Sequence, residues 1–382
     1  MPRSSDVVVV GAGVFGAWTA LQLRRTGRSV TLVDAFGAGN TRSSSSGATR
    51  VIRVGYGAHL IYSQWAQRSA LAWRELFRDW RQDLFTRTGV LWMARDDDQA
   101  INDTIATLRR LHVPFESLDR SALEQRFPQF NFGPITRGLL EPDAGVIMAR
   151  RAVQMVVRQA VKQSVDYRIT AVTAPTGTGA IDGLSASDGS RLTAGTYVFA
   201  CGPWLAKLFP SVVGGRLQST RQEVFFFGAE PGTQRFVPPH MPAWIDVAGG
   251  VYGVPDLEGR GFKIGLHHHG PPFDPDTGER IVSDGALQLA RMILAKRVPS
   301  LAQAPLLEAR VCQYTNSGTG DFLIDQHPDH DNVWLVGAGS GHGFKHGPAV
   351  GEYVAAQLSG RGSPEPRFTL NAHRPGQERR IF

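Results

Sequence analysis

A strand, a glycine turn and a helix at the N-terminus constrain the fold more than any other part of the chain. Residues 7–16 read VVVVGAGVFG, so four valines predict a buried strand, and Gly11, Gly13 and Gly16 form a G-x-G-x-x-G turn before a helix at about residues 15–26. The first glycine permits a tight turn, the second lets a pyrophosphate approach the backbone, and the third lets the helix pack on the strand. Because the N–H groups of a helix N-terminus attract anions, the pattern predicts a dinucleotide site.

A second apolar run, SVTLVD, ends at Asp34, which lies 18 residues after Gly16. A carboxylate at this position can accept hydrogen bonds from a ribose and disfavours a 2′-phosphate. The spacing therefore favours FAD or NAD as the dinucleotide. The glycines alone would also fit an ordinary tight turn between a strand and a helix.

Composition narrows the class of protein. A length of 382 residues favours two domains, and 42% apolar and 20% charged residues are typical of a soluble globular protein. The net charge is +7 with no dense Lys/Arg run, so we expect no nucleic acid partner and a modest preference for a small anionic substrate. No apolar run is long enough to span a membrane, and the N-terminus leads directly into a core strand, so we expect no signal peptide and a cytoplasmic location.

Cysteines and histidines give no sign of a disulfide framework or a metal centre. Cys201 and Cys312 are the two cysteines of the chain. The run His267-His268-His269 lacks tetrahedral spacing, because adjacent residues on a strand point to opposite faces. We therefore expect no metal site.

The pattern of apolar residues along the chain predicts an α/β fold. We expect a discontinuous Rossmann-like domain of residues 1–82, 146–216 and 310–382, with an inserted α+β substrate domain, built on an antiparallel sheet, of residues 83–145 and 217–309. The C-terminal tail, rich in Arg and Pro, is expected to be poorly ordered. Further helices are predicted at 58–80, 101–111, 150–161, 284–297 and 348–358, and further strands at 90–95, 138–141, 167–172, 191–200, 223–227, 250–254, 261–266 and 332–336.

A second glycine-rich loop follows the predicted strand 332–336. Five glycines, from Gly337 to Gly347, fall within 11 residues and precede a helix. So many glycines indicate a backbone that lies against a flat ligand, and a helix N-terminus there would stabilise the negative charge of a reduced flavin. Since NAD needs no second loop of this kind, the loop favours FAD.

Several cations fall where they could line a cavity next to such a ligand. On the predicted strand 261–266 the residues alternate, which places Lys263 and His267 on one face, with Tyr252 on the neighbouring strand. Arg50 and Arg53 follow the serine-rich loop at 43–46, and arginine suits the capture of a carboxylate. Cys312 and Tyr314 share a face of an extended segment, where a cysteine could anchor a flavin.

Motifs spread over nearly the whole chain resemble a known family. The stretches VVVVGAGVFGAWTALQL, SGATRVIRVGYG, FACGPWLAKL, YGVPD, FKIGLH, VCQYTNSGTGDFLID and GSGHGFKHGPAVGE are similar to those of the monomeric sarcosine oxidase and N-methyltryptophan oxidase group within the D-amino acid oxidase-like flavoenzymes. Two departures, serines in place of histidines at 43–46 and the pair His268-His269, concern the identity of the substrate rather than the chemistry.

The resemblance implies a role for each matching residue. Cys312 would carry FAD through an 8α-S-cysteinyl bond, Lys263 would activate O₂, and Arg53 with Lys345 would hold the substrate carboxylate. Arg50, Tyr252, His267 and Tyr314 would line the cavity shared by flavin and substrate, with Arg50, His267 and Tyr314 counted with Lys263 as catalytic. The FAD contacts would fall on Gly11, Ala12, Gly13, Val14, Phe15, Gly16, Asp34, Ser43, Ser44, Ser45, Arg50, Val172, Ala200, Gly202, Trp204, Cys312, Gly339, Gly341, His342, Gly343, Phe344 and Lys345.

The expected reaction is therefore the FAD-dependent oxidation of a secondary or N-methyl amino acid to an imine, with O₂ reduced to H₂O₂. The expected partners are this amino acid and O₂, and a monomer is favoured. Three alternatives stay open: a flavin-dependent amine dehydrogenase with another acceptor, a flavin-binding subunit without turnover, and an NAD-linked dehydrogenase that would show no absorbance near 450 nm. The residues do not identify the amine.

Overall fold

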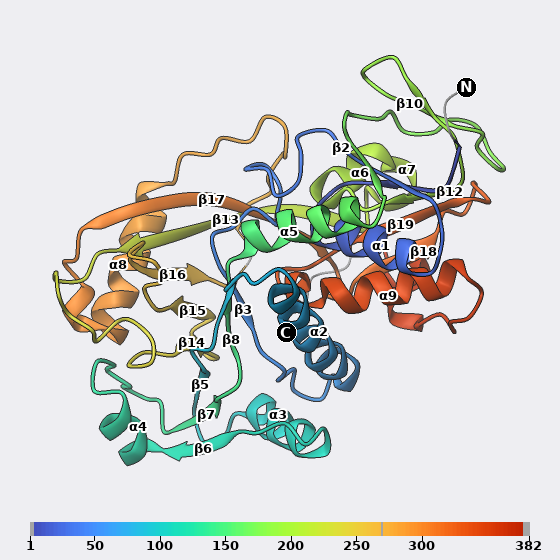
Figure 1. The fold of residues 1–382 in the computed structure, drawn as a ribbon. Coiled ribbons are helices and arrows are strands. Elements are labelled where there is room, and N and C mark those ends of the chain that lie inside the picture. The colour runs from blue at the N-terminus through green and yellow to red at the C-terminus, as the bar shows by residue number, and fades with distance from the viewer. Residues whose placement is uncertain (1–3, 269, 377–382) are drawn as a thin grey trace.

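The computed structural model describes residues 4–268 and 270–376, and a six-stranded sheet forms the half of the molecule that carries the N-terminal glycine turn (Figure 1). Five strands are parallel, and β18 joins the edge antiparallel to β19. The predicted Rossmann-like sheet is confirmed, because strands from distant parts of the chain pair on it in parallel. In sheet order the strands are β18 (Leu323–Gln326), β19 (Val333–Gly337), β12 (Ala194–Phe199), β1 (Ser5–Val10), β2 (Val30–Asp34) and β9 (Asp166–Ile169).

Four predicted helices pack around this sheet and begin and end within two residues of their expected limits. α1 follows the glycine turn and contacts both α5 and α9, while α2 packs on α9 (Figure 1). α1 and α9 approach closely because Gly351 has no side chain: a Cβ there would lie 2.6 Å from the carbonyl oxygen of Trp18. The four helices are α1 (Val14–Arg25), α2 (Leu60–Asp79), α5 (Ala149–Lys162) and α9 (Gly347–Leu358).

An eight-stranded sheet forms the other half of the molecule, as predicted for the substrate domain. Its strands are antiparallel except for the parallel pair of β14 and β5. In sheet order they are β17 (Leu306–Ser317), β13 (Leu217–Phe227), β16 (Phe262–Leu266), β15 (Val251–Val254), β14 (Ala243–Asp246), β5 (Val90–Ala94), β7 (Arg137–Glu141) and β6 (Glu116–Asp119).

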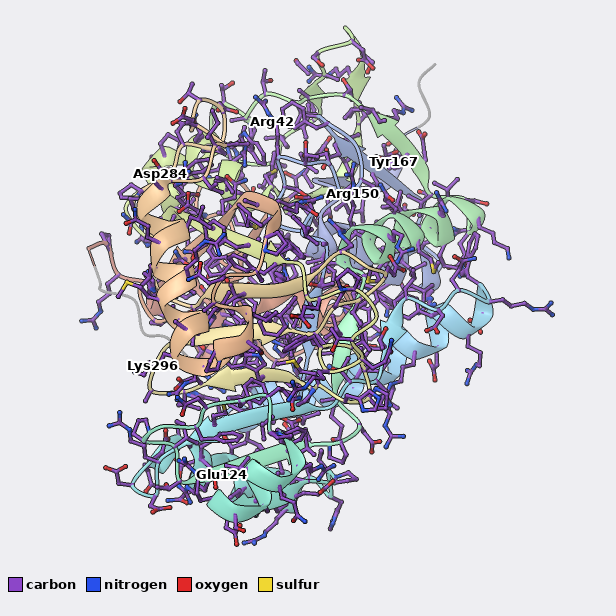
Figure 2. The ribbon with its side chains drawn as sticks, turned by 90° about the vertical axis from the view of Figure 1, so that its left-hand side faces the viewer. Arg42, Glu124, Arg150, Tyr167, Asp284 and Lys296 are labelled. Atoms are coloured by element: carbon purple, nitrogen blue, oxygen red, sulfur yellow. The ribbon has the colours of Figure 1, made fainter. Side chains whose placement is uncertain are left out.

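The helix α8 (Asp284–Arg297) covers part of the outer face of this sheet, and the inner face is left for the site. α8 matches its predicted limits, and the Ser283 side chain caps its first turn by accepting a hydrogen bond from the Ala286 N–H. Ala290 and Leu294 of α8 belong to one apolar core with Phe225 and Phe227 of β13 and Phe262 of β16. In Figure 2, Asp284 and Lys296 mark the two ends of α8 on the face toward the viewer.

Two long strands cross the width of the molecule and connect the two halves. β13 and β17 lie side by side and pair from Leu217–Ser317 to Phe227–Leu306 (Figure 1). The predicted domain limit at residue 310 falls inside β17, so this strand belongs to the eight-stranded sheet as far as Ser317. We keep the two-domain division as a prediction with that strand assigned to the substrate domain.

Smaller elements complete the fold. The C-terminal tail was predicted to be poorly ordered, and this prediction is wrong up to residue 376. Phe368 and His373 are buried, and His373 Nε2 forms a hydrogen bond with the Phe322 carbonyl oxygen at 3.0 Å. The remaining helices and strands are β3 (Arg50–Ile52), β4 (Phe85–Thr86), α3 (Gln99–Arg110), α4 (Arg120–Arg126), β8 (Gly145–Ile147), β10 (Leu184–Ser185), β11 (Arg191–Leu192), α6 (Leu205–Leu208) and α7 (Pro210–Val213), with short 3₁₀ turns at Gly202–Trp204, Pro299–Leu301, Gly343–His346, Pro366–Phe368 and Leu370–Ala372.

Candidate active site

A cleft of about 450 Å³ opens at the carboxyl ends of the parallel strands, where the glycine turn lies. Ligands of open α/β sheets bind at this edge. Most of the residues expected to contact a dinucleotide line it: Gly11, Gly13, Val14, Phe15, Asp34, Ser43, Ser44, Ser45, Arg50, Val172, Ala200, Gly202, Trp204, Gly339, Gly341, Gly343 and Phe344.

The glycine turn has the close packing that its sequence predicts. Gly11 has a φ of +105°, and a Cβ there would lie 2.5 Å from the Ala200 carbonyl oxygen. A Cβ on Gly16 would lie 1.8 Å from the Gly11 carbonyl oxygen, so Gly16 serves the packing of α1 on β1 and does not line the cleft. Ala12 does not line it either, but its N–H donates to Asp34 Oδ2 at 2.7 Å and fixes that carboxylate.

Polar groups of the cleft have unused hydrogen-bonding capacity that suits a dinucleotide. Ser44 Oγ and Thr315 Oγ1 are buried without a hydrogen-bond partner among the described residues, and both side chains line the cleft. A buried hydroxyl without a partner is unfavourable, so a polar ligand in the cleft would satisfy both. Burial raises the pKa of Asp34, and N–H donors from Phe36 and Ala12 oppose that rise.

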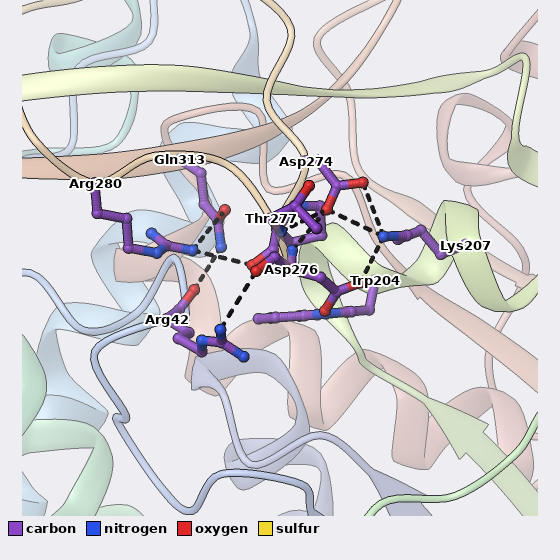
Figure 3. A network of polar contacts seen from close by, with 9 residues as sticks. Arg42, Trp204, Lys207, Asp274, Asp276, Thr277, Arg280 and Gln313 are labelled. Atoms are coloured by element: carbon purple, nitrogen blue, oxygen red, sulfur yellow. Dashed lines mark hydrogen bonds and ion pairs between the residues drawn. The ribbon is translucent and has the colours of Figure 1, made fainter.

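A loop from the substrate half forms a network of polar contacts with residues at the nucleotide cleft (Figure 3). Asp276 lines the cleft and accepts a hydrogen bond from Trp204 Nε1 at 2.7 Å. Lys207 forms ion pairs with both Asp276 and Asp274, and Arg42 donates to the Asp276 carbonyl oxygen at 3.3 Å. These contacts join the two halves at a position that the sequence did not reveal.

The second glycine-rich loop, between β19 and α9, contacts both this cleft and a second cavity. Gly341 has a φ of +78°, and a Cβ there would lie 2.7 Å from the Tyr314 ring. Ala338 and Ser340 also have positive φ angles, +54° and +45°, although neither is a glycine. Strained backbone of this kind persists where the surrounding structure enforces it, and it gathers at functional sites.

A larger cavity of about 910 Å³ lies between this loop and the inner face of the eight-stranded sheet. It meets the nucleotide cleft at Arg50, Tyr314, Gly341 and Phe344, which line both. All residues predicted to act on the substrate line this cavity, namely Lys263, His267, Arg50, Tyr314, Arg53, Lys345 and Tyr252, and so do Cys312 and His342, which were predicted as FAD contacts.

Lys263 extends from β16 into the cavity. Its neighbours Phe262 and Ile264 are buried in the core under α8, so the predicted alternation is confirmed, and Lys263 itself is only 2% exposed. Its Nζ donates to the carbonyl oxygen and to Oγ1 of Thr49, both at 3.3 Å. Burial, and then the nearby charge of Arg50, lower the pKa of Lys263 to about 7.

Arg50 and Cys312 are neighbours at the junction of the two cavities. The Arg50 Nη2 donates to the Ser44 carbonyl oxygen at 2.8 Å and lies 3.6 Å from Cys312 Sγ. The Cys312 sulfur therefore lies at the wall of the second cavity described above, next to the arginine that lines both the cleft and that cavity.

Arg53 is held between two aromatic rings. Its guanidinium carbon lies 4.3 Å from the Tyr56 ring centroid and 4.4 Å from that of Trp92, and one N–H donates to the Gly55 carbonyl oxygen. Behind it, the buried Glu141 accepts hydrogen bonds from Trp92 Nε1 at 2.9 Å and from the Gly55 N–H at 3.2 Å. The two aromatic rings and the network around Glu141 together fix the orientation of Arg53, which is 7% exposed.

Lys345 is the second cation at this end of the cavity. Its Nζ donates to the Tyr56 hydroxyl at 2.7 Å and to the His342 carbonyl oxygen at 3.2 Å. Burial and the charge of Arg53 lower the pKa of Lys345 well below its usual value, and Glu141 partly opposes them.

Within the described residues, none of these cations forms an ion pair. Among the described residues, no carboxylate oxygen lies within 4.0 Å of Arg50, Arg53, Lys263 or Lys345. Burial of an unpaired charge is costly and lowers the pKa of both lysines, so an anion bound in this cavity would stabilise the charged forms of these side chains. The sequence analysis did not identify the residues that support these cations, namely Tyr56, Trp92, Glu141, Thr49 and His346. For Tyr56 the sequence held one signal, because this tyrosine lies in the stretch SGATRVIRVGYG together with both arginines.

Comparison with known proteins agrees with this geometry. A model of the family described as FAD dependent oxidoreductase (DAO) matches residues 6–357. The chain belongs to this family of FAD-dependent oxidoreductases. A monomeric sarcosine oxidase from Bacillus sp. (strain B-0618) is 31% identical over 97% of the chain and 96% of its own length, and an N-methyl-L-tryptophan oxidase from Citrobacter koseri is 28% identical over 96% of each. An L-proline dehydrogenase from P. horikoshii has the same fold, with a TM-score of 0.83 at 20% identity over 96% of both chains.

The residues present fit the cofactor of the family. The cleft with Asp34 and the unpartnered Ser44 and Thr315 hydroxyls would hold the dinucleotide part of FAD, and Arg50 and Tyr314 lie at the opening through which the flavin ring would reach the second cavity.

Within residues 4–268 and 270–376, no helix is long and apolar enough to cross a membrane. Over the same residues, no cluster of three His, Cys, Asp or Glu side chains could hold a metal ion.

Proposed function

We propose that this FAD-dependent oxidoreductase oxidises a secondary or N-methyl amino acid to an imine, with O₂ reduced to H₂O₂. The substrate loses two electrons and two protons, and O₂ takes up both. The observation that carries the proposal is the group of Arg53, Lys345, Lys263 and Arg50, which line one cavity without a carboxylate partner in the described chain. The sarcosine and N-methyltryptophan oxidases among the relatives support the choice of amine.

Each cation has a separate task in this proposal. Bound FAD would supply the two-electron redox chemistry that links the C–H bond beside the amine to the electron acceptor. Arg53 and Lys345 hold the substrate carboxylate and so orient that carbon. The cations around the cavity disfavour a protonated amine, which must be neutral to release electron density. Lys263 stabilises the negative charge that develops on O₂.

Cys312 is proposed to anchor the cofactor covalently. The bond between its sulfur and the 8α-methyl carbon would replace the S–H bond and one methyl C–H bond, and the two protons and two electrons released would pass to O₂ to give H₂O₂. Its position at the wall of the cavity, 3.6 Å from Arg50 Nη2, supports this role.

The test of the function is a screen of secondary amino acids with purified protein. We expect a flavin spectrum near 450 nm, bleaching by the substrate under anaerobic conditions, and equal consumption of O₂ and formation of H₂O₂ in air. Bleaching without O₂ consumption would identify a dehydrogenase, and a flavin spectrum without bleaching by any amine would identify a binding subunit. A colourless folded protein would leave only the NAD-linked alternative.

Replacing Arg53 or Lys345 by Met should weaken carboxylate recognition. Removing one partner of a buried charge pair costs about 2–5 kcal/mol, so we expect kcat/KM for sarcosine to fall at least roughly thirtyfold. Dimethylamine, which lacks the carboxylate, serves as the control and should be oxidised equally slowly by parent and variants. An equal loss with both amines would mean that these cations do not bind the carboxylate.

Reaction with O₂ should depend on the protonation of Lys263. Because the pKa of Lys263 is lowered to about 7, its charge is present below this pH and is lost as the pH rises through it. We expect the rate constant for reoxidation of reduced enzyme to fall between pH 6 and pH 9, with a profile that Lys263→Met makes flat. Stopped-flow mixing with O₂ measures both profiles, and a flat profile for the parent would rule out this role.

Oligomeric state and location stay predictions. The Bacillus relative is named a monomeric enzyme, which supports a monomer for this chain. Gel filtration tests that proposal, and cell fractionation tests the predicted cytoplasmic location.

A further inference from the structure

A buried tyrosine connects the two predicted carboxylate-binding cations. Tyr56 is 4% exposed, its ring stacks on Arg53, and its hydroxyl lies 2.7 Å from Lys345 Nζ. The same hydroxyl lies 2.8 Å from His346 Nε2 and 3.3 Å from His342 Nδ1. Tyr56 is therefore the common neighbour of four polar side chains that come from opposite ends of the chain.

The hydrogen-bond roles in this cluster can be assigned. His342 Nε2 faces the Gly320 carbonyl oxygen at 3.0 Å, so Nε2 carries the proton and Nδ1 accepts one, from the Tyr56 hydroxyl. The two lone pairs of that hydroxyl then accept from Lys345 Nζ and from His346 Nε2. His346 is fully buried, and its Nδ1 has no partner among the described residues. A buried nitrogen without a partner is less costly as an acceptor than as an N–H donor, so the proton of His346 is assigned to Nε2.

This arrangement leaves one donor of Lys345 for the cavity. An ammonium has three N–H donors, and Lys345 uses two, on Tyr56 and on the His342 carbonyl oxygen. Lys345 lines the cavity, whereas His346 lies behind it. We propose that Tyr56 is a positioning residue that holds the Lys345 ammonium toward the substrate carboxylate, and that His346 holds Tyr56 in place.

The proposal rests on the proposed function through the carboxylate-binding role of Lys345. Removing the Tyr56 hydroxyl takes an acceptor from the ammonium and favours neutral Lys345, in a site that also faces Arg53, Glu141, His342 and His346. Carboxylate binding should therefore be lost at a lower pH in Tyr56→Phe than in the parent. The Phe ring keeps the contact with Arg53.

The experiment titrates holoenzyme with benzoate, which carries no amine, and follows the flavin spectrum from pH 6 to pH 10. We expect Tyr56→Phe to bind benzoate at least tenfold more weakly at pH 8, with the basic limb of the Kd profile moved to lower pH. Uncharged benzamide should bind both proteins equally. His346→Gln, whose amide can donate from a similar position, should bind benzoate as the parent does, whereas His346→Leu should weaken it.

A second tyrosine supplies the matched control. Tyr62 is fully buried, and its hydroxyl donates to Asp321 Oδ1 at 2.7 Å. Tyr62→Phe should lower thermal stability without changing the affinity for benzoate. If Tyr56→Phe binds benzoate like the parent while Lys345→Met does not, the positioning role is overturned and the carboxylate-binding role survives. If Lys345→Met also binds benzoate normally, the carboxylate-binding role itself fails, and the positioning role fails with it.

Discussion

Replacing Lys263 by Met is expected to slow reoxidation of the reduced enzyme by O₂ about a hundred- to a thousandfold, with little change in the rate of flavin reduction by the substrate. Removing one preorganised charge from the site where negative charge develops has an effect of this size. Lys263 is buried against Thr49, and no carboxylate of the described chain neutralises it, so its charge is available to O₂. Anaerobic stopped-flow measurement of the two half-reactions separates the effects.

Two further variants define the Lys263 experiment. Lys263→Arg keeps the charge and should restore part of the rate with O₂. Lys296→Met makes the same chemical change at the exposed end of α8 and should leave both half-reactions unchanged (Figure 2). An equal loss in reduction and in reoxidation by Lys263→Met would show that Lys263 acts on the substrate or on folding instead.

Replacing Cys312 by Ala is expected to convert covalent flavin into flavin that acid releases completely. In the parent, the yellow colour should stay with the acid-precipitated protein, because a thioether survives denaturation. In Cys312→Ala the colour should move to the supernatant, although FAD still binds in the folded protein through the nucleotide cleft. Absorbance at about 450 nm in pellet and supernatant measures the outcome.

The chain's other cysteine is the control for this experiment. Cys201 lines the nucleotide cleft, its sulfur lies 3.5 Å from the Val10 carbonyl oxygen, and burial raises the pKa of its thiol. A protonated thiol is a poor nucleophile, so Cys201→Ala should keep the flavin in the pellet. Flavin that washes out of the parent, or that stays bound in Cys312→Ala, contradicts the anchor.

Much of the fold could be predicted because local patterns agree with the tertiary structure. α8 matches its expected limits, since a serine cap, an acidic first turn and a basic last turn act within the helix itself. β13 was expected at 223–227 but begins at Leu217, because its first half is held by pairing with β17 rather than by an apolar pattern of its own. β14 was missed for the same reason, because one of its two partner strands is β5, which lies far earlier in the chain.

The candidate site was predictable where a motif carries its own chemistry. The glycine turn with Asp34, and the alternation that turns Lys263 away from the core, are local and appear in the structure as expected. Tyr56 and His346 were not predictable, since the Tyr56 hydroxyl and Lys345 Nζ are 289 residues apart in the chain. Glu141 was missed because a lone glutamate on a strand has no pattern that distinguishes a buried acceptor from an exposed charge.

The amino-acid sequence by itself determined the dinucleotide fold and the flavin family, and most of the site residues predicted from it line the two cavities. Glycine spacing and strand alternation are properties of neighbouring residues, so they can be read from the sequence. Only the tertiary structure decided that the cavity cations have no ion-pair partner among the residues that the structure describes, and that a tyrosine and a histidine lie against one of them. Charge pairing and burial depend on which distant segments pack together, and no local pattern in the chain records that packing.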